Sequence, residues 1–257
     1  MWKVKRRKAL EDKLSNLVYE DFLEALNSRP EMARSYESLM SNLHLLHSTR
    51  PLTTILVTST QPDEGKTTIT ANLALSMVLG GKRVLILDTD LRKPRIYQVF
   101  KLENTQGVAD ILTGSLNAQD VIQVVEVAND PPKNQSTLNV ITSGRVSPNS
   151  FNVMESPKLR EAIEYLRAVY DVILFDSSPL LSVSDALLLA PMVDGVILVL
   201  NTGIVSEKDA KRAKDRIEQA GGHILGVVMN RFNEKLHGKS YHPYYGYYKG
   251  YYDGQTT

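Results

Sequence analysis

Six apolar runs alternate with helical patterns along most of this chain. The runs contain few polar residues, as expected of strands that are covered by helices on both faces. They lie at residues 53–58, 83–87, 138–142, 172–175, 196–200 and 224–229. The helical patterns between them lie at residues 67–79, 155–169, 184–190 and 207–220. Strands that alternate with helices predict an α/β fold with a doubly wound, mostly parallel sheet.

Two further helical patterns precede the first predicted strand. Residues 2–8 form a basic cluster with one tryptophan, and apolar residues then recur at helical spacing up to residue 26. Such a segment can rest on anionic lipid or on a membrane partner, or it can be a solvated terminus. The second pattern, at residues 31–47, is predicted to pack on the main domain. We therefore expect an N-terminal basic and helical arm over residues 1–50, which contacts other subunits or a membrane partner.

The composition narrows the class of protein. With 30 lysines and arginines against 29 aspartates and glutamates, the chain has almost no net charge, which argues against a nucleic-acid-binding protein. It has no cysteine, which excludes disulfides and thiolate metal sites and fits a reducing cytosol. No apolar run approaches the roughly 20 residues that span a bilayer. We expect one large α/β domain over residues 51–235 and a tail over residues 236–257.

One loop carries the strongest chemical signal in the chain. The apolar run at residues 53–58 leads into a Gly-Lys-Thr turn, and a helical pattern starts at once. Backbone N–H groups around Gly65 and the positive end of the helix dipole can hold a phosphate there. Lys66 adds a full positive charge, and the Thr67 hydroxyl can ligate magnesium. The predicted nucleotide-binding residues of this loop are Asp63, Glu64, Gly65, Lys66, Thr67 and Thr68.

Aspartates follow two of the predicted strands directly. Asp88 and Asp90 come after the strand at residues 83–87, and Asp176 comes after the strand at residues 172–175. In open parallel sheets, ligands bind at the carboxyl ends of the strands, where a magnesium ion needs carboxylates, directly or through water. Taken singly, an aspartate after an apolar run is a turn former or a helix cap. Taken with the Gly-Lys-Thr turn in this chain order, the aspartates predict a metal site.

The last residues form a tyrosine cluster. Seven of the twelve tyrosines lie there, interleaved with glycine, proline and lysine, and almost no aliphatic residue is available to form a core. We therefore expect a flexible tail. It can be a low-complexity segment prone to aggregate, a stacking platform for sugars or nucleic acid, or a set of phosphate acceptors. These tyrosines are Tyr241, Tyr244, Tyr245, Tyr247, Tyr248, Tyr251 and Tyr252.

Together these motifs resemble the bacterial tyrosine kinases (BY-kinases), which regulate capsule and exopolysaccharide export. Residues 59–68 resemble their Walker A motif, residues 84–92 their Walker A′ motif, and residues 172–176 their Walker B motif. The similarity covers roughly residues 50–232 and the tail. Further matching stretches lie at residues 90–94, 107–114, 182–186 and 226–231. The resemblance implies a P-loop NTPase fold with a ParA/MinD-like architecture.

The resemblance also implies an activity, that of an ATP- and magnesium-dependent protein tyrosine kinase that phosphorylates its own C-terminal tyrosines, between subunits. Lys66 and the loop amides would hold the β- and γ-phosphates, and Asp90 or Asp88 would accept the proton of the tyrosine hydroxyl. The implied magnesium ligands are Thr67, Asp88 and Asp176. The implied catalytic residues are Lys66, Asp88, Asp90, Arg92 and Asp176.

Asn230 and Arg231 come directly after the last predicted strand. They resemble the base-contacting position of the family, and an asparagine side chain can read one donor and one acceptor of adenine. The alternative is an ordinary turn after a strand. We expect these two residues to contribute to nucleotide binding.

Partners and location are implied by the same resemblance. It implies a homo-oligomer and a transmembrane adaptor of the polysaccharide co-polymerase type, or a membrane segment of the chain's own that is missing from this sequence. A counteracting phosphotyrosine phosphatase is also implied, and no nucleic acid. The expected location is cytoplasmic, peripheral to the inner face of the plasma membrane.

The phosphate loop departs from the family pattern at two positions. Thr60 replaces a glycine or alanine, and Asp63 replaces a glycine. Aspartate tolerates the left-handed backbone conformation better than most residues, so the loop can still close. Two acids beside phosphates are unfavourable, however, unless Asp63 and Glu64 point to solvent or cap a neighbouring amide. Slower catalysis is one possible result.

The upstream helix departs further. Family members carry a Glu-x-x-Arg-x-x-Arg motif whose arginines bridge neighbouring subunits into a ring. Here Glu37 stands where the second arginine belongs after Glu31 and Arg34, and the alternative register gives Arg34, Glu37 and Met40. Either way an arginine is missing, which puts the ring in doubt.

Two other classes of protein remain open. A partitioning ATPase of the ParA/MinD type shares the sheet and the motifs, but such proteins place an extra lysine early in the loop and lack a tyrosine tail. A catalytically weak, nucleotide-dependent regulator of polysaccharide assembly would fit the acidic loop and the altered helix. Phosphoryl transfer to tyrosine separates that regulator from a kinase.

Overall fold

A seven-stranded sheet forms the centre of the fold, with the strand order β3-β4-β2-β5-β1-β6-β7. The computed structural model describes residues 28, 30–130, 134–145, 154 and 156–232. The strands are β1 (Thr54–Ser59), β2 (Val84–Asp88), β3 (Gln123–Asp130), β4 (Asn134–Ile141), β5 (Val172–Asp176), β6 (Gly195–Asn201) and β7 (Ile224–Asn230). Neighbouring strands are parallel except for the antiparallel pair β3 and β4. The predicted mostly parallel α/β sheet is confirmed.

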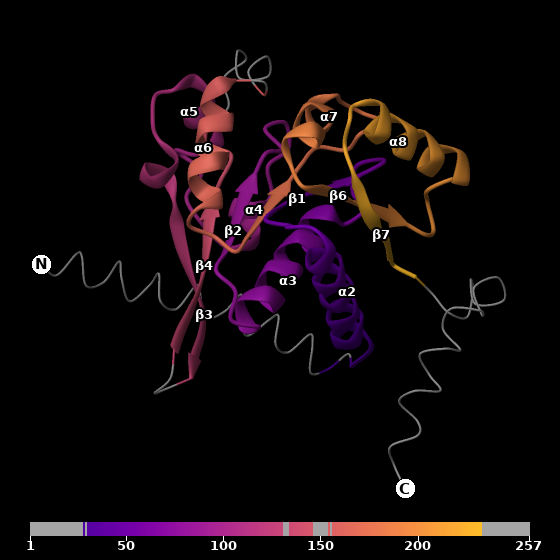
Figure 1. Cartoon of the computed structure of the whole chain (residues 1–257), viewed down its shortest axis with the longest axis horizontal. Helices are drawn as coiled ribbons and strands as arrows, with labels where there is room; N and C mark the ends of the chain where they lie inside the picture. The colour runs from indigo at the N-terminus through magenta and orange to yellow at the C-terminus, as the bar shows by residue number, and fades with distance from the viewer. Residues whose placement is uncertain (1–27, 29, 131–133, 146–153, 155, 233–257) are drawn as a thin grey trace, which may run out of the picture.

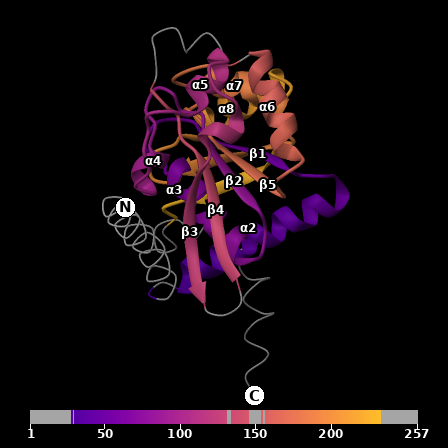
Figure 2. The same cartoon turned by 90° about the vertical axis from the view of Figure 1, so that its left-hand side faces the viewer.

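Helices cover both faces of this sheet (Figure 1). The α-helices are α2 (Pro30–Thr49), α3 (Lys66–Leu79), α4 (Ile96–Val99), α5 (Val108–Thr113), α6 (Pro157–Arg167), α7 (Asp185–Leu189) and α8 (Glu207–Gln219). Within the described residues, short 3₁₀ helices lie at Ala118–Val121 and Ala190–Met192. Helices α2 and α3 cover one face, while α5, α6, α7 and α8 cover the other (Figures 1 and 2).

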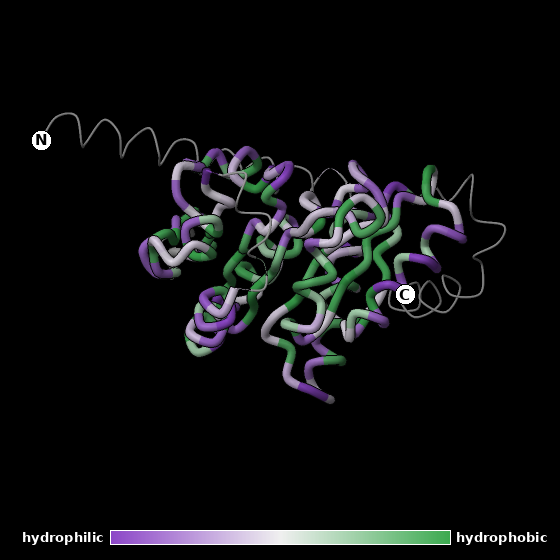
Figure 3. The backbone as a smooth tube through the Cα atoms, turned by 90° about the horizontal axis from the view of Figure 1, so that it is seen from above, coloured by the Kyte–Doolittle hydropathy of each residue, from purple (hydrophilic) through white to green (hydrophobic). Residues whose placement is uncertain are grey.

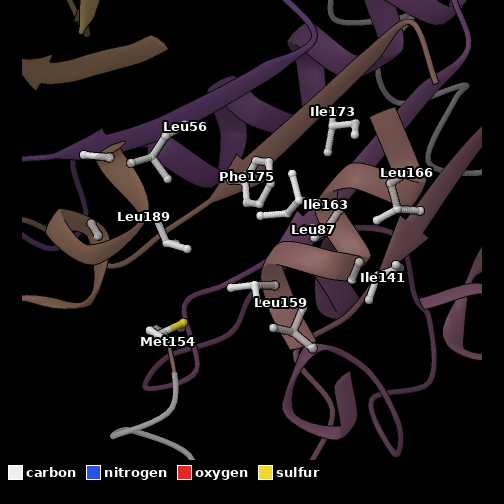
Figure 4. Close-up of a cluster of buried hydrophobic side chains, with 14 of the residues drawn as sticks. Leu56, Leu87, Ile141, Met154, Leu159, Ile163, Leu166, Ile173, Phe175 and Leu189 are labelled. Carbon is white, nitrogen blue, oxygen red and sulfur yellow. The ribbon is translucent and has the colours of Figure 1, made fainter. Parts of the chain in front are cut away.

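The strands divide their side chains between two hydrophobic cores. In β5, Ile173 and Phe175 face the core under α5, α6, α7 and α8, while Val172 and Leu174 face the core under α2 and α3. Figure 4 shows Phe175 in the first of these cores, together with Leu87 of β2 and Ile163 of α6. Fully burying such a side chain stabilises the fold by roughly 1.5–3 kcal/mol. Burial on both faces explains why central strands such as β2 and β5 are apolar up to their final aspartate. Figure 3, coloured by the hydropathy of each residue, shows hydrophobic segments running through the middle of the molecule.

Some elements differ from the sequence prediction. Strand β3 was not predicted, because its apolar residues alternate: Val125 and Val127 are buried, whereas Val124 is 59% exposed. Such alternation is typical of a strand with one covered face. The short helices α4 and α5 were also missed, because fewer than two turns carry too little periodicity. Strand β7 was expected to be covered on both faces, but as an edge strand it is only half-buried.

Helix α2 packs on the main domain, as predicted. Tyr36 and Leu43 are buried against α3, and Tyr36 Oη accepts a hydrogen bond from Asn72 Nδ2 at 3.0 Å. Burial raises the pKa of Tyr36, which keeps its hydroxyl neutral. Arg34 and Glu37 lie on the exposed side of α2, whereas Met40 packs toward the core. Met40 therefore serves packing.

Two predicted segments fall outside the described residues. These are the basic N-terminal segment, residues 1–27, and the tail with its seven tyrosines, residues 233–257. Among the helices that the structure describes, none is long and apolar enough to cross a bilayer. The proposed boundaries at residues 50 and 235 stay predictions.

Candidate active site

The predicted site residues gather at the carboxyl edge of the sheet. Strand β1 lies between β5 and β6, and the chain leaves it through the phosphate loop into α3. Asp88 and Asp176 are the last residues of β2 and β5, and they are direct neighbours in the register of these strands. The sheet topology thus brings the two aspartates and the phosphate loop to one place, as ligand sites in open α/β sheets require.

Gly65 cannot be replaced by another residue without distorting the phosphate loop. Its φ of +93° lies in the left-handed region, and a Cβ atom added there would lie 2.1 Å from Nδ2 of Asn230. Only glycine combines this φ with so close an approach. Asp63 has a φ of +62°, in keeping with the sequence prediction, and its side chain is 79% exposed beside Arg95. Its charge therefore points away from the phosphate site.

Glu64 turns inward and closes the phosphate loop on itself. Only 1% of this residue is exposed. Its carboxylate accepts hydrogen bonds from the backbone N–H groups of Thr60 and Gln61, both at 3.2 Å, and from the Thr60 hydroxyl. Burial raises the pKa of Glu64, although these hydrogen bonds oppose the shift. The unusual Thr60 therefore has a partner, and Glu64 caps neighbouring amides, which is one of the two outcomes foreseen from the sequence.

Lys66 and Thr67 each contact one of the predicted carboxylates. Lys66 Nζ lies 3.1 Å from Asp90 Oδ2, and the lysine side chain is only 12% exposed. Thr67 Oγ1 donates a hydrogen bond of 2.7 Å to Asp176 Oδ2, and Thr70 Oγ1 donates a weaker one of 3.3 Å to Asp176 Oδ1. Thr70 was not singled out in the sequence, yet it lies three residues after Thr67, on the same side of α3.

Asp88 is held by backbone N–H groups. Its Oδ1 accepts from Asp90 N at 3.2 Å, and its Oδ2 accepts from Arg95 N and Ile96 N at 3.2 and 3.1 Å. Asp90 Oδ1 in turn accepts from Lys93 N at 3.1 Å. These bonds fold the segment after β2 around the two carboxylates and fix their positions.

Negative charge is in excess at this edge. Burial raises the pKa of Asp176 to about 6, against the opposing effect of Lys66. Burial, together with the neighbouring Asp176, raises the pKa of Asp88 well above its usual range. Burial disfavours the charge on Lys66, but the carboxylates of Asp176 and Asp90 outweigh it and raise its pKa. Such strongly shifted groups in one place are typical of a functional site.

The remaining predicted residues are more peripheral. Arg92 Nε donates to Asp185 Oδ2 at 2.8 Å, and so links the segment after β2 to the start of α7. Asn230 reaches the phosphate loop, where its Nδ2 donates to the Glu64 carbonyl at 2.8 Å. Arg231 is exposed with a φ of +54°, and Thr68 is exposed in the first turn of α3. Asp185 was not assigned a role from the sequence, although it lies in the matching stretch 182–186.

The donors present fit a magnesium nucleotide. A hydroxyl, Thr67, and a carboxylate, Asp176, meet at the start of a helix with excess negative charge nearby. In the part of the chain that the structure describes, no cluster of three or more histidine, cysteine or acidic residues could hold a metal alone. Phosphate oxygens and water would have to complete the shell, as is usual for magnesium in phosphate-transfer sites.

Comparison with known proteins identifies the family. Residues 55–250 match the CobQ/CobB/MinD/ParA nucleotide binding domain. The tyrosine-protein kinase YwqD of Bacillus subtilis is 34% identical over 83% of this chain and 86% of the relative. This chain belongs to the bacterial tyrosine-protein kinases. The resemblance drawn from the sequence motifs is therefore confirmed.

Solved structures agree with this family assignment. The kinase domain of Escherichia coli tyrosine kinase ETK matches with a TM-score of 0.69 and 28% identity, over 77% of this chain and 76% of that domain. The septum site-determining protein MinD of Pyrococcus horikoshii, complexed with Mg-ADP, matches with a TM-score of 0.57 and 27% identity, over 71% of this chain and 72% of MinD. This kinase family member therefore has the MinD-type nucleotide-binding fold, and the ATPase alternative is less well supported.

Proposed function

We propose that this chain transfers the γ-phosphoryl group of ATP to tyrosine, in a magnesium-dependent reaction, and that its acceptors include the C-terminal tyrosines. The observation that carries the proposal is the meeting of Lys66 and Thr67 with Asp90 and Asp176 at the edge of the sheet. Its membership of the bacterial tyrosine-protein kinases supports tyrosine as the acceptor.

Lys66 and the amides that follow Gly65 would hold the β- and γ-phosphates. Phosphoryl transfer passes through a loose transition state, so that positioning and charge neutralisation contribute most. The tyrosine oxygen forms a bond to the γ-phosphorus as the bond to the bridging oxygen of ADP breaks. Lys66 would stabilise the negative charge that develops on that leaving oxygen.

Thr67 and Asp176 would hold the magnesium, with Asp88 on its water shell. When bound, the ion supplies positive charge that neutralises the phosphate oxygens. Thr67 and Thr70 already orient Asp176 through their hydroxyls. The carboxylate is thus fixed before any nucleotide arrives, which removes an ordering cost from binding.

Asp90 is our candidate for the group that accepts the tyrosine proton. A tyrosine hydroxyl has a pKa near 10 and keeps its proton until the new bond forms. Both oxygens of Asp88 accept hydrogen bonds from backbone N–H groups. Oδ2 of Asp90 instead pairs with Lys66. Bound phosphates would also attract Lys66 and so leave this oxygen available to the tyrosine proton. Comparing Asp90→Asn with Asp88→Asn tests this choice, because loss of the base should leave nucleotide binding intact.

Oligomerisation and membrane association are part of the proposal. We propose a homo-oligomer at the inner face of the plasma membrane, joined to a transmembrane adaptor of the polysaccharide co-polymerase type or to a membrane segment of its own. A phosphotyrosine phosphatase would reverse the modification. Arg34 and Glu37 on α2 are exposed and so accessible to another subunit.

The test is to incubate the protein with ATP and magnesium and to map phosphotyrosine by mass spectrometry, with Lys66→Met in parallel. We expect labelled tail tyrosines in the wild type and none in the variant. Phosphate release with an unmodified tail would instead support an ATPase. Nucleotide binding without either reaction would support the regulator. Mixing Lys66→Met protein with an active, tail-deleted form then tests transfer between subunits.

A further inference from the structure

Both polar atoms of the Asn230 side chain are engaged within the protein. Nδ2 donates to the carbonyl of Glu64 at 2.8 Å, and Oδ1 accepts from the backbone N–H of Arg231 at 2.9 Å. The orientation of the amide group is fixed by these partners, since one is a carbonyl and the other an N–H group. Each of these atoms can make one more hydrogen bond, since an amide oxygen has two lone pairs and the NH₂ group two hydrogens, so the two internal bonds give Asn230 a role inside the protein beside any contact with adenine.

The bond to Glu64 falls at the most sensitive point of the phosphate loop. Gly65, with its left-handed φ, follows at once, and its N–H belongs to the same peptide group as the Glu64 carbonyl. In phosphate loops, successive backbone N–H groups of this kind face the phosphate. The Glu64 carboxylate holds the opposite side of the loop through Thr60 and Gln61. Glu64 is thus held at its side chain by the loop and at its carbonyl by Asn230.

Asn230 is itself rigidly placed. It is the last residue of β7 and pairs in register with Asn201 of β6. Thr202 N donates to the Asn230 carbonyl at 3.2 Å, and Thr202 Oγ1 donates to the Arg231 carbonyl at 3.1 Å. Arg231 has a positive φ of 54°, and its N–H is held by the adjacent Asn230 side chain. The edge of the sheet therefore offers a fixed point for the loop.

We propose that Asn230 is a positioning residue for the phosphate loop. Its amide orients the Glu64–Gly65 peptide, so that the loop amides are preorganised for phosphate whichever base the nucleotide carries. The proposal differs from a base-contacting role and does not depend on transfer to tyrosine. A positioning residue of this kind affects all phosphate ligands alike, whereas a base contact affects only nucleotides.

The experiment compares two ligands, Mg-ATP and Mg-tripolyphosphate, by calorimetry on the full chain. Asn230→Ala should weaken both by a similar factor, about tenfold, which is the value of one hydrogen bond. Asn117→Ala is the control, because it removes an asparagine outside the phosphate loop, at the start of the 3₁₀ helix at Ala118–Val121, whose Nδ2 donates to Asp120 Oδ2. We expect the control to change binding of either ligand by less than about twofold.

A second variant changes the bond to Glu64 without shortening the side chain, and the urea denaturation curve of each variant shows that it is folded. Asn230→Asp keeps the shape and the bond to Arg231 N, but it sets a carboxylate oxygen against the Glu64 carbonyl, so both affinities should fall by more than in Asn230→Ala. If ATP binding falls while tripolyphosphate binding is unchanged, Asn230 reads the base and the proposal is wrong. Unchanged binding of both ligands also overturns it. Because no transfer is measured, either result is separate from failure of the proposed kinase activity.

Discussion

Asp194 and Asp176 are both largely removed from solvent, but they lie at opposite ends of the same sheet, and their pKa values are shifted in opposite directions. Asp194 precedes β6 at the amino edge, where burial raises its pKa but the hydrogen bonds of Arg167, Thr54 and Thr53 outweigh burial and lower it. Asp176 ends β5 at the carboxyl edge, where burial raises its pKa to about 6. The same type of side chain thus has a lowered pKa at the amino edge of the sheet and a raised pKa at the carboxyl edge.

The contacts explain the difference. Asp194 accepts from two backbone amides and one hydroxyl of Thr53 and Thr54, and from both terminal nitrogens of Arg167 at 2.8 to 3.0 Å. Asp176 accepts hydrogen bonds from only two hydroxyls. The positive charge of Lys66 is nearby, but its ammonium group is paired with Asp90. A buried carboxylate with a full set of hydrogen bonds and a paired cation stabilises the fold. A buried carboxylate whose charge is only partly balanced retains affinity for a cation. The amino edge therefore serves stability, and the carboxyl edge serves binding at some cost to stability.

Asp176→Asn should produce the largest effect. We expect tyrosine phosphorylation to fall by about 10³-fold, because the proposed metal ligand is lost. The nucleotide-free protein should become more stable, since the buried charge is removed. Kinetic assays and urea denaturation measure the two quantities. A variant that lost activity and stability together would contradict the contrast between the edges.

Asp194→Asn should show the reverse behaviour. Removing the charge opposite Arg167 should lower the free energy of unfolding by about 3 kcal/mol, as urea denaturation would measure. Activity per folded molecule should be unchanged. Asp171→Asn is the control, because Asp171 pairs with the exposed Arg83 at the same edge and should shift the denaturation midpoint little.

The pH dependence of stability should separate the two aspartates. Because the folded pKa of Asp176 lies above its unfolded value, the native state binds the extra proton between about pH 4 and 6, and the free energy of unfolding falls as pH rises through that window, by about 3 kcal/mol. Asp194, with its lowered pKa, adds stability that is lost as pH falls below about 4. Urea titrations with chelator and without nucleotide measure the slope. An unchanged slope in Asp176→Asn would contradict the assignment.

Two threonine substitutions should give the smallest effects. Thr54→Val removes a hydroxyl that bonds to Asp194 and Arg167, and should lower the free energy of unfolding by about 1 kcal/mol without loss of activity. Thr67→Val removes a hydroxyl that donates to the buried Asp176, so it should lower the free energy of unfolding by about as much and, in addition, lower the affinity for magnesium nucleotide. Thermal denaturation with and without Mg-ATP distinguishes these outcomes, and equal behaviour of the two variants would argue against separate roles.

Much of the fold was predictable because the central strands are apolar on both faces. Runs such as residues 172–175 signal burial directly, and the aspartate that follows marks the end of the strand. Strand β3 was missed because it is an edge strand with only one face covered, so its buried and exposed residues alternate. Its pairing with β4 depends on tertiary contacts that no local pattern encodes.

The sequence indicated which residues lie together at the carboxyl edge of the sheet, but it did not indicate the contacts among them. Glu64 next to phosphates looked unfavourable in the sequence, and only the fold shows that Thr60 and Gln61 use its charge. The resemblance to the family suggested a base contact for Asn230. Nothing in the sequence indicates that its side chain reaches the Glu64 carbonyl. The pairing of Arg92 with Asp185 likewise joins residues 93 positions apart, which spacing alone does not reveal.

The bond between Glu64 and Asn230 also has a consequence for synthesis of the chain. The two residues are 166 positions apart, and Thr67 and Asp176 are 109 apart. Because a chain emerges from the ribosome N-terminus first, the phosphate loop is made long before its partners. The nascent loop lacks its anchor until β7, the last strand that the structure describes, has joined the sheet. Nucleotide capture by a growing chain should therefore begin late, after nearly the whole domain has been translated.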